Sequence, residues 1–208
     1  MRIALVYDMI YPYYVGGAEI RNRELSARLA EKHEVHLFGV KLWDGPDVFE
    51  EDGVTVHGVC GYGKQNSFSG SRTTSDVLRF AAAITKPLIR ERFDVIDVSA
   101  FPPTQHITAR LASAATEAKL ILTWHQFCGE YLKLYLGPLM GSAAAHMERM
   151  AAKTGPSHVA VSEHVKKNLL SAGADPADVY VNVNGVDLAA TAAAKPADEA
   201  FDLSLIHI

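Results

Sequence analysis

The stretch RIALVYDMIYPYYVGGAEIRNRELSARLAEKHEVHLFGV, residues 2–40, decides the fold. It begins with an apolar run at 3–7, passes through a loop, continues at 18–30 with apolar residues at helical spacing, and ends in a second apolar run at 35–40. Two buried strands joined by an amphipathic helix form a βαβ unit, and such a crossover makes the two strands parallel. The stretch therefore predicts a parallel sheet.

The rest of the chain continues the alternation of short apolar runs and helical segments. Further strands are expected at 54–59, 95–98, 120–123, 159–161 and 179–183, and further helices at 74–90, 103–115, 142–153 and 163–172. The last of these helices has Ser162 as its N-cap and Gly173 as its C-terminal stop. This pattern predicts an α/β fold, a Rossmann-like doubly wound and mainly parallel sheet with helices on both faces.

Composition excludes several classes of protein. The 208 residues carry a net charge of -4, which provides no field for gathering a nucleic acid. With 2 Cys the chain has no disulfide framework, and the N-terminus has no cleavage site of a signal peptide. No apolar stretch reaches the ~20 residues that cross a bilayer. We expect a cytoplasmic protein, with any membrane contact peripheral and made by a basic surface that includes Arg149 and Lys153.

Gly16 and Gly17 stand immediately before the first helix. The free N–H groups and the positive dipole end of a helix N-terminus attract a phosphate, and glycines allow the backbone to approach it closely. A turn that merely needs a positive φ is the alternative. Tyr13 and Tyr14 precede the glycines and suit sugar recognition, or equally form a hydrophobic latch over the sheet edge. The spacing is not that of G-x-G-x-x-G, which disfavours a dinucleotide site.

His125 follows a buried strand, so its imidazole is expected at the same edge of the sheet as the glycine turn. The chain has nine His, but His36 and His57 fall at strand edges without a third ligand at metal-site spacing, so no metal is expected. His146 and Glu148 are expected to be solvated polar residues. G-x-S-x-G is absent, which disfavours a serine hydrolase.

The combination of RIALVYD, P-x-x-x-G-G-A-E, TWH, VSEHVKKNL and NGVD, in this order over residues 1–190, resembles the N-terminal half of a family 4 retaining glycosyltransferase of the GT-B fold. The resemblance implies two Rossmann-like domains facing each other across a cleft. The N-terminal domain mainly receives the acceptor, and the C-terminal domain holds the nucleotide sugar.

By this resemblance, Gly16 and Gly17, with Glu19 and the tyrosines 13 and 14, contact phosphate or substrate. His125 would act as the catalytic residue beside the transferred sugar. Asn184, Gly185 and Asp187 would mark the interdomain hinge. The partners implied are a nucleotide sugar and a glycan, lipid-linked or small-molecule acceptor in cell-surface glycan assembly. No cofactor and no metal are expected.

The last six residues, LSLIHI, equal the in-frame translation of a transposon mosaic-end adaptor, CTG TCT CTT ATA CAC ATC. We therefore expect 203–208 to be a non-native tail, with a natural apolar tail as the alternative. Residues 1–185 would form the acceptor-side domain and 186–202 the start of the interdomain linker. The C-terminal donor domain, with its basic residues and paired glutamates, would be missing, which predicts an inactive fragment.

Two other functions stay open. The domain could be a stand-alone module that holds a phosphorylated or sugar ligand without turnover, which a native stop codon near Asp202 would indicate. A nicotinamide-dependent reductase is also compatible with the fold class. Binding of a dinucleotide would support that reading.

Overall fold

A mainly parallel eight-stranded sheet forms the centre of the computed structural model, which describes residues 1–61 and 73–193. The strands follow the order β3-β4-β2-β1-β5-β6-β7-β8, and all neighbours are parallel except the antiparallel β3 and β4. The strands are β1 (Arg2–Val6), β2 (Glu34–Lys41), β3 (Val48–Glu51), β4 (Val54–Gly61), β5 (Val95–Ser99), β6 (Lys119–Trp124), β7 (His158–Ala160) and β8 (Val179–Val181).

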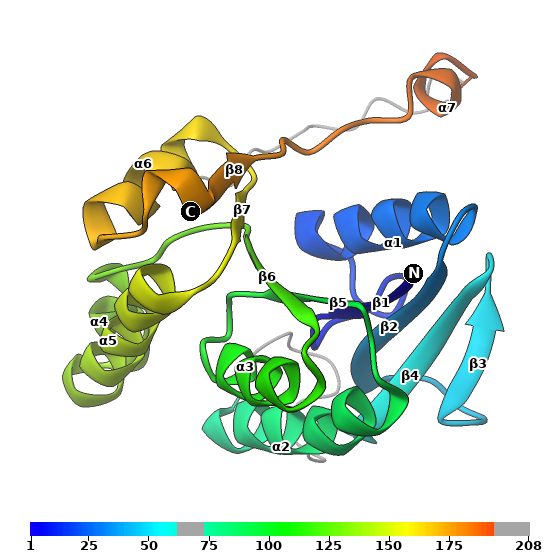
Figure 1. Ribbon diagram of the computed structural model, residues 1–208, viewed down its shortest axis with the longest axis horizontal. Coiled ribbons are helices and arrows are strands. Elements are labelled where there is room, and N and C mark those ends of the chain that lie inside the picture. Colours follow the sequence, from blue (N-terminus) through cyan, green and yellow to red (C-terminus); the bar gives the residue numbers. More distant parts are fainter. Residues whose placement is uncertain (62–72, 194–208) are drawn as a thin grey trace, which may run out of the picture.

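Helices cover both faces of this sheet, with α1 on one face and α2 and α3 on the other (Figure 1). The predicted doubly wound α/β fold is therefore confirmed. The helices are α1 (Gly17–Ala30), α2 (Thr74–Glu91), α3 (Thr104–Thr116), α4 (Tyr131–Leu136), α5 (Pro138–Thr154), α6 (Glu163–Ala172) and α7 (Leu188–Ala193), with a 3-10 turn at Pro176–Asp178. Residues 62–72 and the expected tail at 203–208 lie outside the described residues.

Each face of the sheet has its own core, because successive side chains of a strand point to opposite faces. Ile3 and Leu5 of β1 pack in the cluster on the α1 face. Ala4 and Val6 of the same strand pack in the larger cluster that includes Leu88 of α2. The buried strands are apolar on both faces, as expected for parallel strands covered on both sides.

The strand β3, the helices α4 and α7 and the 3-10 turn were not predicted, and glycine positions explain β3 and α4. β3 pairs with β4 through a tight turn in which Asp52 and Gly53 both have positive φ, 50° and 76°, and this Asp-Gly pair is a hairpin signal. α4 precedes α5 and is separated from it by Gly137, whose φ is +81°. A Cβ at Gly141 would collide with the backbone of Leu132, so a glycine allows the two helices to approach closely.

The predicted caps of α6 are confirmed. The hydroxyl of Ser162 accepts a hydrogen bond from the N–H of Val165 at 3.2 Å, and Gly173 ends the helix with a φ of +100°. Within residues 1–61 and 73–193, no helix is both long and apolar enough to cross a membrane.

The core on the α2 face provides a direct test of the fold. Leu88 is fully buried, whereas Leu78 on the same helix is 55% exposed. We expect Leu88→Ala to lower the free energy of unfolding by about 2–5 kcal/mol through lost burial and a residual cavity. Leu78→Ala is the matched control and should change it by less than about 0.5 kcal/mol. Urea denaturation measures both, and equal effects would contradict this packing.

Candidate functional site

The site lies where the sheet reverses its strand order, between β1 and β5. The chain leaves β1 for α1 on one face and leaves β5 for α3 on the other, so the two loops separate at the carboxyl ends of these strands. Open α/β sheets bind ligands at such a switch point. The glycine turn follows β1, and His125 follows β6, the strand next to β5.

The backbone at Gly16 and Gly17 does not require glycine. Gly16 is extended, with φ -156° and ψ 174°, and Gly17 has no positive φ either. The alternative of a turn that needs positive φ is therefore wrong. A Cβ at Gly16 would collide with the carboxylate of Glu19, whereas a Cβ at Gly17 would meet nothing within 4 Å. Gly17 thus leaves open space at the first residue of α1.

The Glu19 side chain lies inside the domain, with 3% of the residue exposed. It lines a small cavity with Met9 and Tyr11 and lies against Gly16. The predicted substrate contact would therefore need another conformation, and in this one the carboxylate packs under the glycine turn. Arg23, four residues on, forms ion pairs with Glu24 at 3.3 Å and Asp52 at 3.5 Å.

The two loop tyrosines are not brought to His125. The ring of Tyr13 packs against Trp43 with 5.3 Å between ring centroids, which is the latch-like contact of the alternative. The backbone N–H of Tyr14 donates to the carbonyl of Ile10 at 3.0 Å. The aromatic neighbour of His125 is the buried Tyr7, whose ring centroid lies 5.8 Å away.

His125 is neutral at physiological pH. Burial, with a smaller contribution from the charge of Arg21, lowers the pKa of this imidazole to about 4. Its Nε2 atom is buried and has no hydrogen-bond partner among the described residues. A neutral imidazole with an unused nitrogen can donate to or accept from a hydroxyl of a ligand.

Arg21 is the residue at this site that the sequence analysis missed. Its Nη1 atom donates to the side-chain oxygen of Asn184 at 3.1 Å and lies 3.4 Å from the carbonyl of Val183. Burial lowers the pKa of Arg21 and the carboxylate of Asp97 partly offsets this. Spacing could have found it, because Arg21 is one helical turn after Gly17 and shares its face of α1.

Asp97 of β5 is the acidic partner in this arrangement. It accepts a hydrogen bond from the hydroxyl of Thr123 at 2.6 Å. Removal from water raises the pKa of its carboxyl group to about 6, although Thr123 and Arg21 oppose the shift. At neutral pH the Asp97 carboxylate is therefore largely ionised and opposes the charge of Arg21, which in turn acts on His125.

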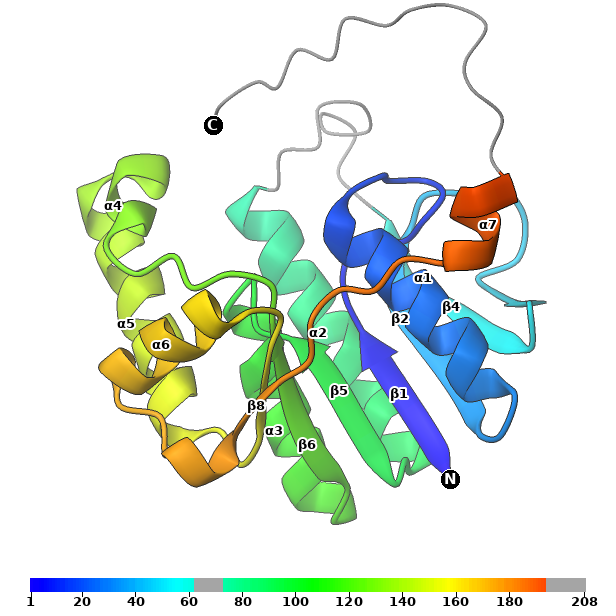
Figure 2. The same cartoon turned by 90° about the horizontal axis from the view of Figure 1, so that it is seen from above.

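The predicted hinge residues and Gly17 line one groove of 440 Å³ between α1 and the segment after β8. Figure 2 shows this segment running along α1 toward α7. Asn184 is held by Arg21, and Asp187 pairs with Arg28 of α1 at 3.3 Å. The structure thus brings Gly17 together with Asn184, Gly185 and Asp187, whereas His125 does not line this groove and is linked to it only by the charge of Arg21.

The prediction that Glu148 is solvated is wrong. The residue is 2% exposed. Its carboxylate accepts hydrogen bonds from the backbone N–H groups of Cys128 at 2.9 Å and Gly129 at 2.6 Å. Burial raises the pKa of Glu148 and the two N–H groups oppose the shift. The helix residue was misjudged because its partners are backbone groups of a loop. Glu148 fixes the loop that begins at His125.

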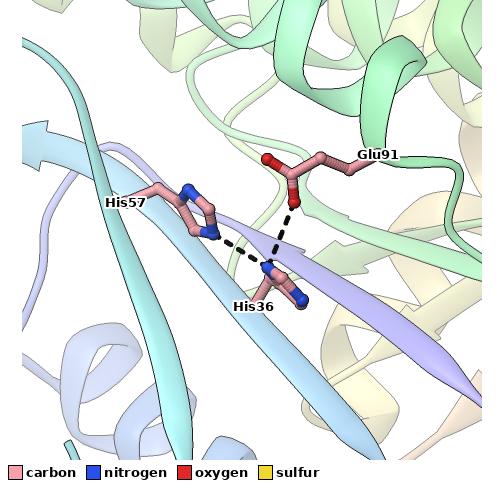
Figure 3. A group of neighbouring side chains, drawn as sticks. All are labelled: His36, His57 and Glu91. Atoms are coloured by element: carbon pink, nitrogen blue, oxygen red, sulfur yellow. Dashed lines mark hydrogen bonds and ion pairs between the residues drawn. The ribbon is translucent and has the colours of Figure 1, made fainter. Parts of the chain in front are cut away.

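The histidines of the sheet require a second correction. His36 and His57 do not lie at strand edges but are buried in the interior of β2 and β4, and Glu91 of α2 points toward them (Figure 3). A third side chain with metal-ligating atoms therefore accompanies the pair, contrary to the expectation from spacing. Glu91 is 34 residues from His57, and a search for ligands at short metal-site spacing in the sequence does not find a residue so far away.

Solved structures share this fold at low sequence identity. Sucrose-phosphate synthase from Thermosynechococcus elongatus superposes with a TM-score of 0.67 at 15% identity, covering 90% of this chain and 49% of that one. HepE from Anabaena, solved in complex with UDP-glucose, gives a TM-score of 0.56 at 16% identity, covering 90% of this chain and 44% of its own. The chain thus spans about half the length of these proteins.

Curated proteins give no match to the chain. The family model of Glycosyltransferase Family 4 matches residues 15–190, a range that begins just before the glycine turn and ends after the hinge residues. The match covers most of the chain, and the fold agrees with it. This chain belongs to Glycosyltransferase Family 4.

Proposed function

We propose that this domain is the acceptor-side half of a retaining glycosyltransferase that moves a sugar from a nucleotide sugar to a glycan, lipid-linked or small-molecule acceptor. The proposal rests on Gly17. Its backbone does not need glycine, no atom of the described residues lies within 4 Å of a Cβ placed there, and it opens into the groove lined by the proposed hinge residues. A missing side chain at a helix N-terminus suits the close approach of a phosphate.

Transfer requires that the charge developing on the leaving diphosphate be stabilised. In our proposal the N-terminus of α1 and the guanidinium of Arg21 contribute part of this stabilisation, and neutral His125 contacts the transferred sugar by a hydrogen bond. The remaining cations come from a C-terminal domain, so we expect residues 1–208 alone to be inactive. The UDP-glucose complex of HepE supports a nucleotide sugar as donor.

Two experiments separate the alternatives. Sequencing the source DNA past the codon of Asp202 distinguishes a continuing frame with a second βαβ domain from a stop codon, which would favour a stand-alone binding module. A nicotinamide-dependent reductase would give a thermal shift with NAD or NADP, and none is expected for this chain because the glycine spacing lacks the dinucleotide fingerprint.

The first prediction concerns Gly17→Ala in the full-length transferase. The alanine has room in the free protein and favours a helix, so the melting temperature should stay equal or rise. Its methyl group would occupy the proposed phosphate position, so kcat/KM should fall by at least about tenfold, which is 1.4 kcal/mol of transition-state stabilisation. Steady-state kinetics with a nucleotide sugar measure this change.

Gly61→Ala is the matched control, because this glycine also has an unobstructed Cβ position and no positive φ but lies at the end of β4. It should leave kcat/KM unchanged. Equal kcat/KM for the Gly17→Ala protein and the wild type would remove the observation on which the proposal depends.

The second prediction concerns the protonation of His125. With a pKa lowered to about 4, its imidazole resonances should stay constant from pH 8 to about 5 and titrate near pH 4. The unfolded chain, with a pKa of ~6.5, takes up this proton first. Protonation of His125 in the unfolded chain therefore lowers the free energy of unfolding as pH falls from ~6.5 to about 4. NMR of the chain, assigned with His125→Gln, measures the midpoint, and a value near 6.5 would contradict burial.

The third prediction concerns the membrane. We propose that an anionic bilayer, which would carry a lipid-linked acceptor, contacts the apolar residues of α4 and α5. Leu134 and Leu139 are 83% and 85% exposed, and Tyr135 beside them suits a bilayer interface. Lys133 and Arg149 flank this surface, although both pair with Glu130.

Flotation of the chain with phosphatidylglycerol vesicles should show binding that drops several-fold in the double variant Leu134→Ser/Leu139→Ser. Leu78→Ser, an equally apolar but remote exposed position on α2, is the control and should bind as the wild type does. Binding that the double variant retains, or no binding of the wild type, would contradict the proposed contact.

A further inference from the structure

Three side chains from separate elements converge on one point between the sheet and α2. His36 comes from β2, His57 from the neighbouring β4, and Glu91 is the last residue of α2 (Figure 3). The Nδ1 atom of His36 lies 2.8 Å from Nε2 of His57 and 3.3 Å from the Oε2 atom of Glu91, and the three atoms all lie within 4.8 Å of one another.

We propose that this cluster, which shares no residue with the groove, binds a divalent transition metal ion such as Zn²⁺. Two imidazoles and a carboxylate are a common donor set for zinc. In a tetrahedral site with bonds of ~2.0 Å, ligand atoms are roughly 3.3 Å apart. The distance from His36 to Glu91 already has this value, and the distance from His36 to His57 needs to open by a few tenths of an ångström.

The far side of the His36 ring shows an outer contact that metal-binding histidines ordinarily have. Its Nε2 atom lies 3.1 Å from a carboxylate oxygen of Glu34, and Arg2 holds the same oxygen at 2.8 Å through its Nε atom. A carboxylate at this position fixes the ring and its tautomer, so that the other nitrogen presents a lone pair to the ion.

Proton placement supports a cation at the centre. When the Nε2–H of His36 donates to Glu34, the Nδ1 atom is a bare acceptor. It then faces the carboxylate oxygen of Glu91, which is also an acceptor. An N–H of His57 can donate to Nδ1 of His36. Nδ1 and the Glu91 oxygen then still face each other as two acceptors with no proton between them. A metal ion accepts a lone pair from all three atoms at once.

The charged groups around the cluster leave a net negative environment. Glu34 and Glu91 are the carboxylates that face it, and Arg2 is the cation, with its Nη2 atom 4.0 Å from Glu91 and its guanidinium over the ring of Phe93. An ion here would tie two strands to the end of α2 and so stabilise the fold. This role is separate from transfer, so its test does not depend on the proposed function.

The test is titration of the tag-free, chelator-treated chain with Co²⁺, whose visible absorption reports tetrahedral coordination, followed by competition with Zn²⁺. We expect one ion per chain and a rise in melting temperature with Zn²⁺. Glu91→Gln, which removes a ligand at the edge of the cluster, should abolish the tetrahedral spectrum. Glu34→Gln should weaken binding by about 10–100-fold through the outer contact.

His146→Gln and Glu31→Gln change exposed residues outside the cluster and are the controls, and circular dichroism verifies that each variant is folded. If Glu91→Gln does not fold, His57→Gln, which removes the ligand on β4, provides the same test. Absence of one-to-one binding by the wild type would overturn the proposal and assign the cluster to a protonated histidine network. Equal binding by Glu91→Gln and His146→Gln would overturn it as well.

Discussion

The pairing of β1 with β2 on one side and β5 on the other is the constraint on which the site depends. Because the two crossovers leave for opposite faces, their loops separate at this one point of the sheet edge. α1 then begins directly beneath the opening, and its Gly17 end and its Arg21 turn face the segment that leaves β8. A different strand order would place the glycine turn and His125 at unrelated edges.

Electrostatics at this edge follow from burial. Arg21 is the cation, Asp97 is held by Thr123 with a raised pKa, and His125 is kept neutral. Arg21 thus places a guanidinium beside the neutral imidazole of His125, and in our proposal these two groups meet the phosphate and the sugar of the substrate. Glu148 contributes from a distance by fixing the backbone after His125. The segment 182–187, which contains the proposed hinge residues, is attached to the same helix through Arg21 and Arg28.

The sequence predicted the parts of this structure that depend on apolar periodicity and on local helix caps. The parallel strands and the caps at Ser162 and Gly173 followed from the sequence pattern. It missed what depends on contacts distant in the chain. Glu148 was misjudged because its partners are loop N–H groups, and the cluster at His36 because Glu91 arrives from another element.

A crystal structure of the full-length transferase with an intact nucleotide sugar would show directly whether Gly17 faces the phosphate. We expect the diphosphate at the N-terminus of α1 beside Gly17, with the sugar in contact with His125 and Arg21. A nucleotide sugar bound away from this edge, with Gly17 still facing solvent, would rule out the proposed site.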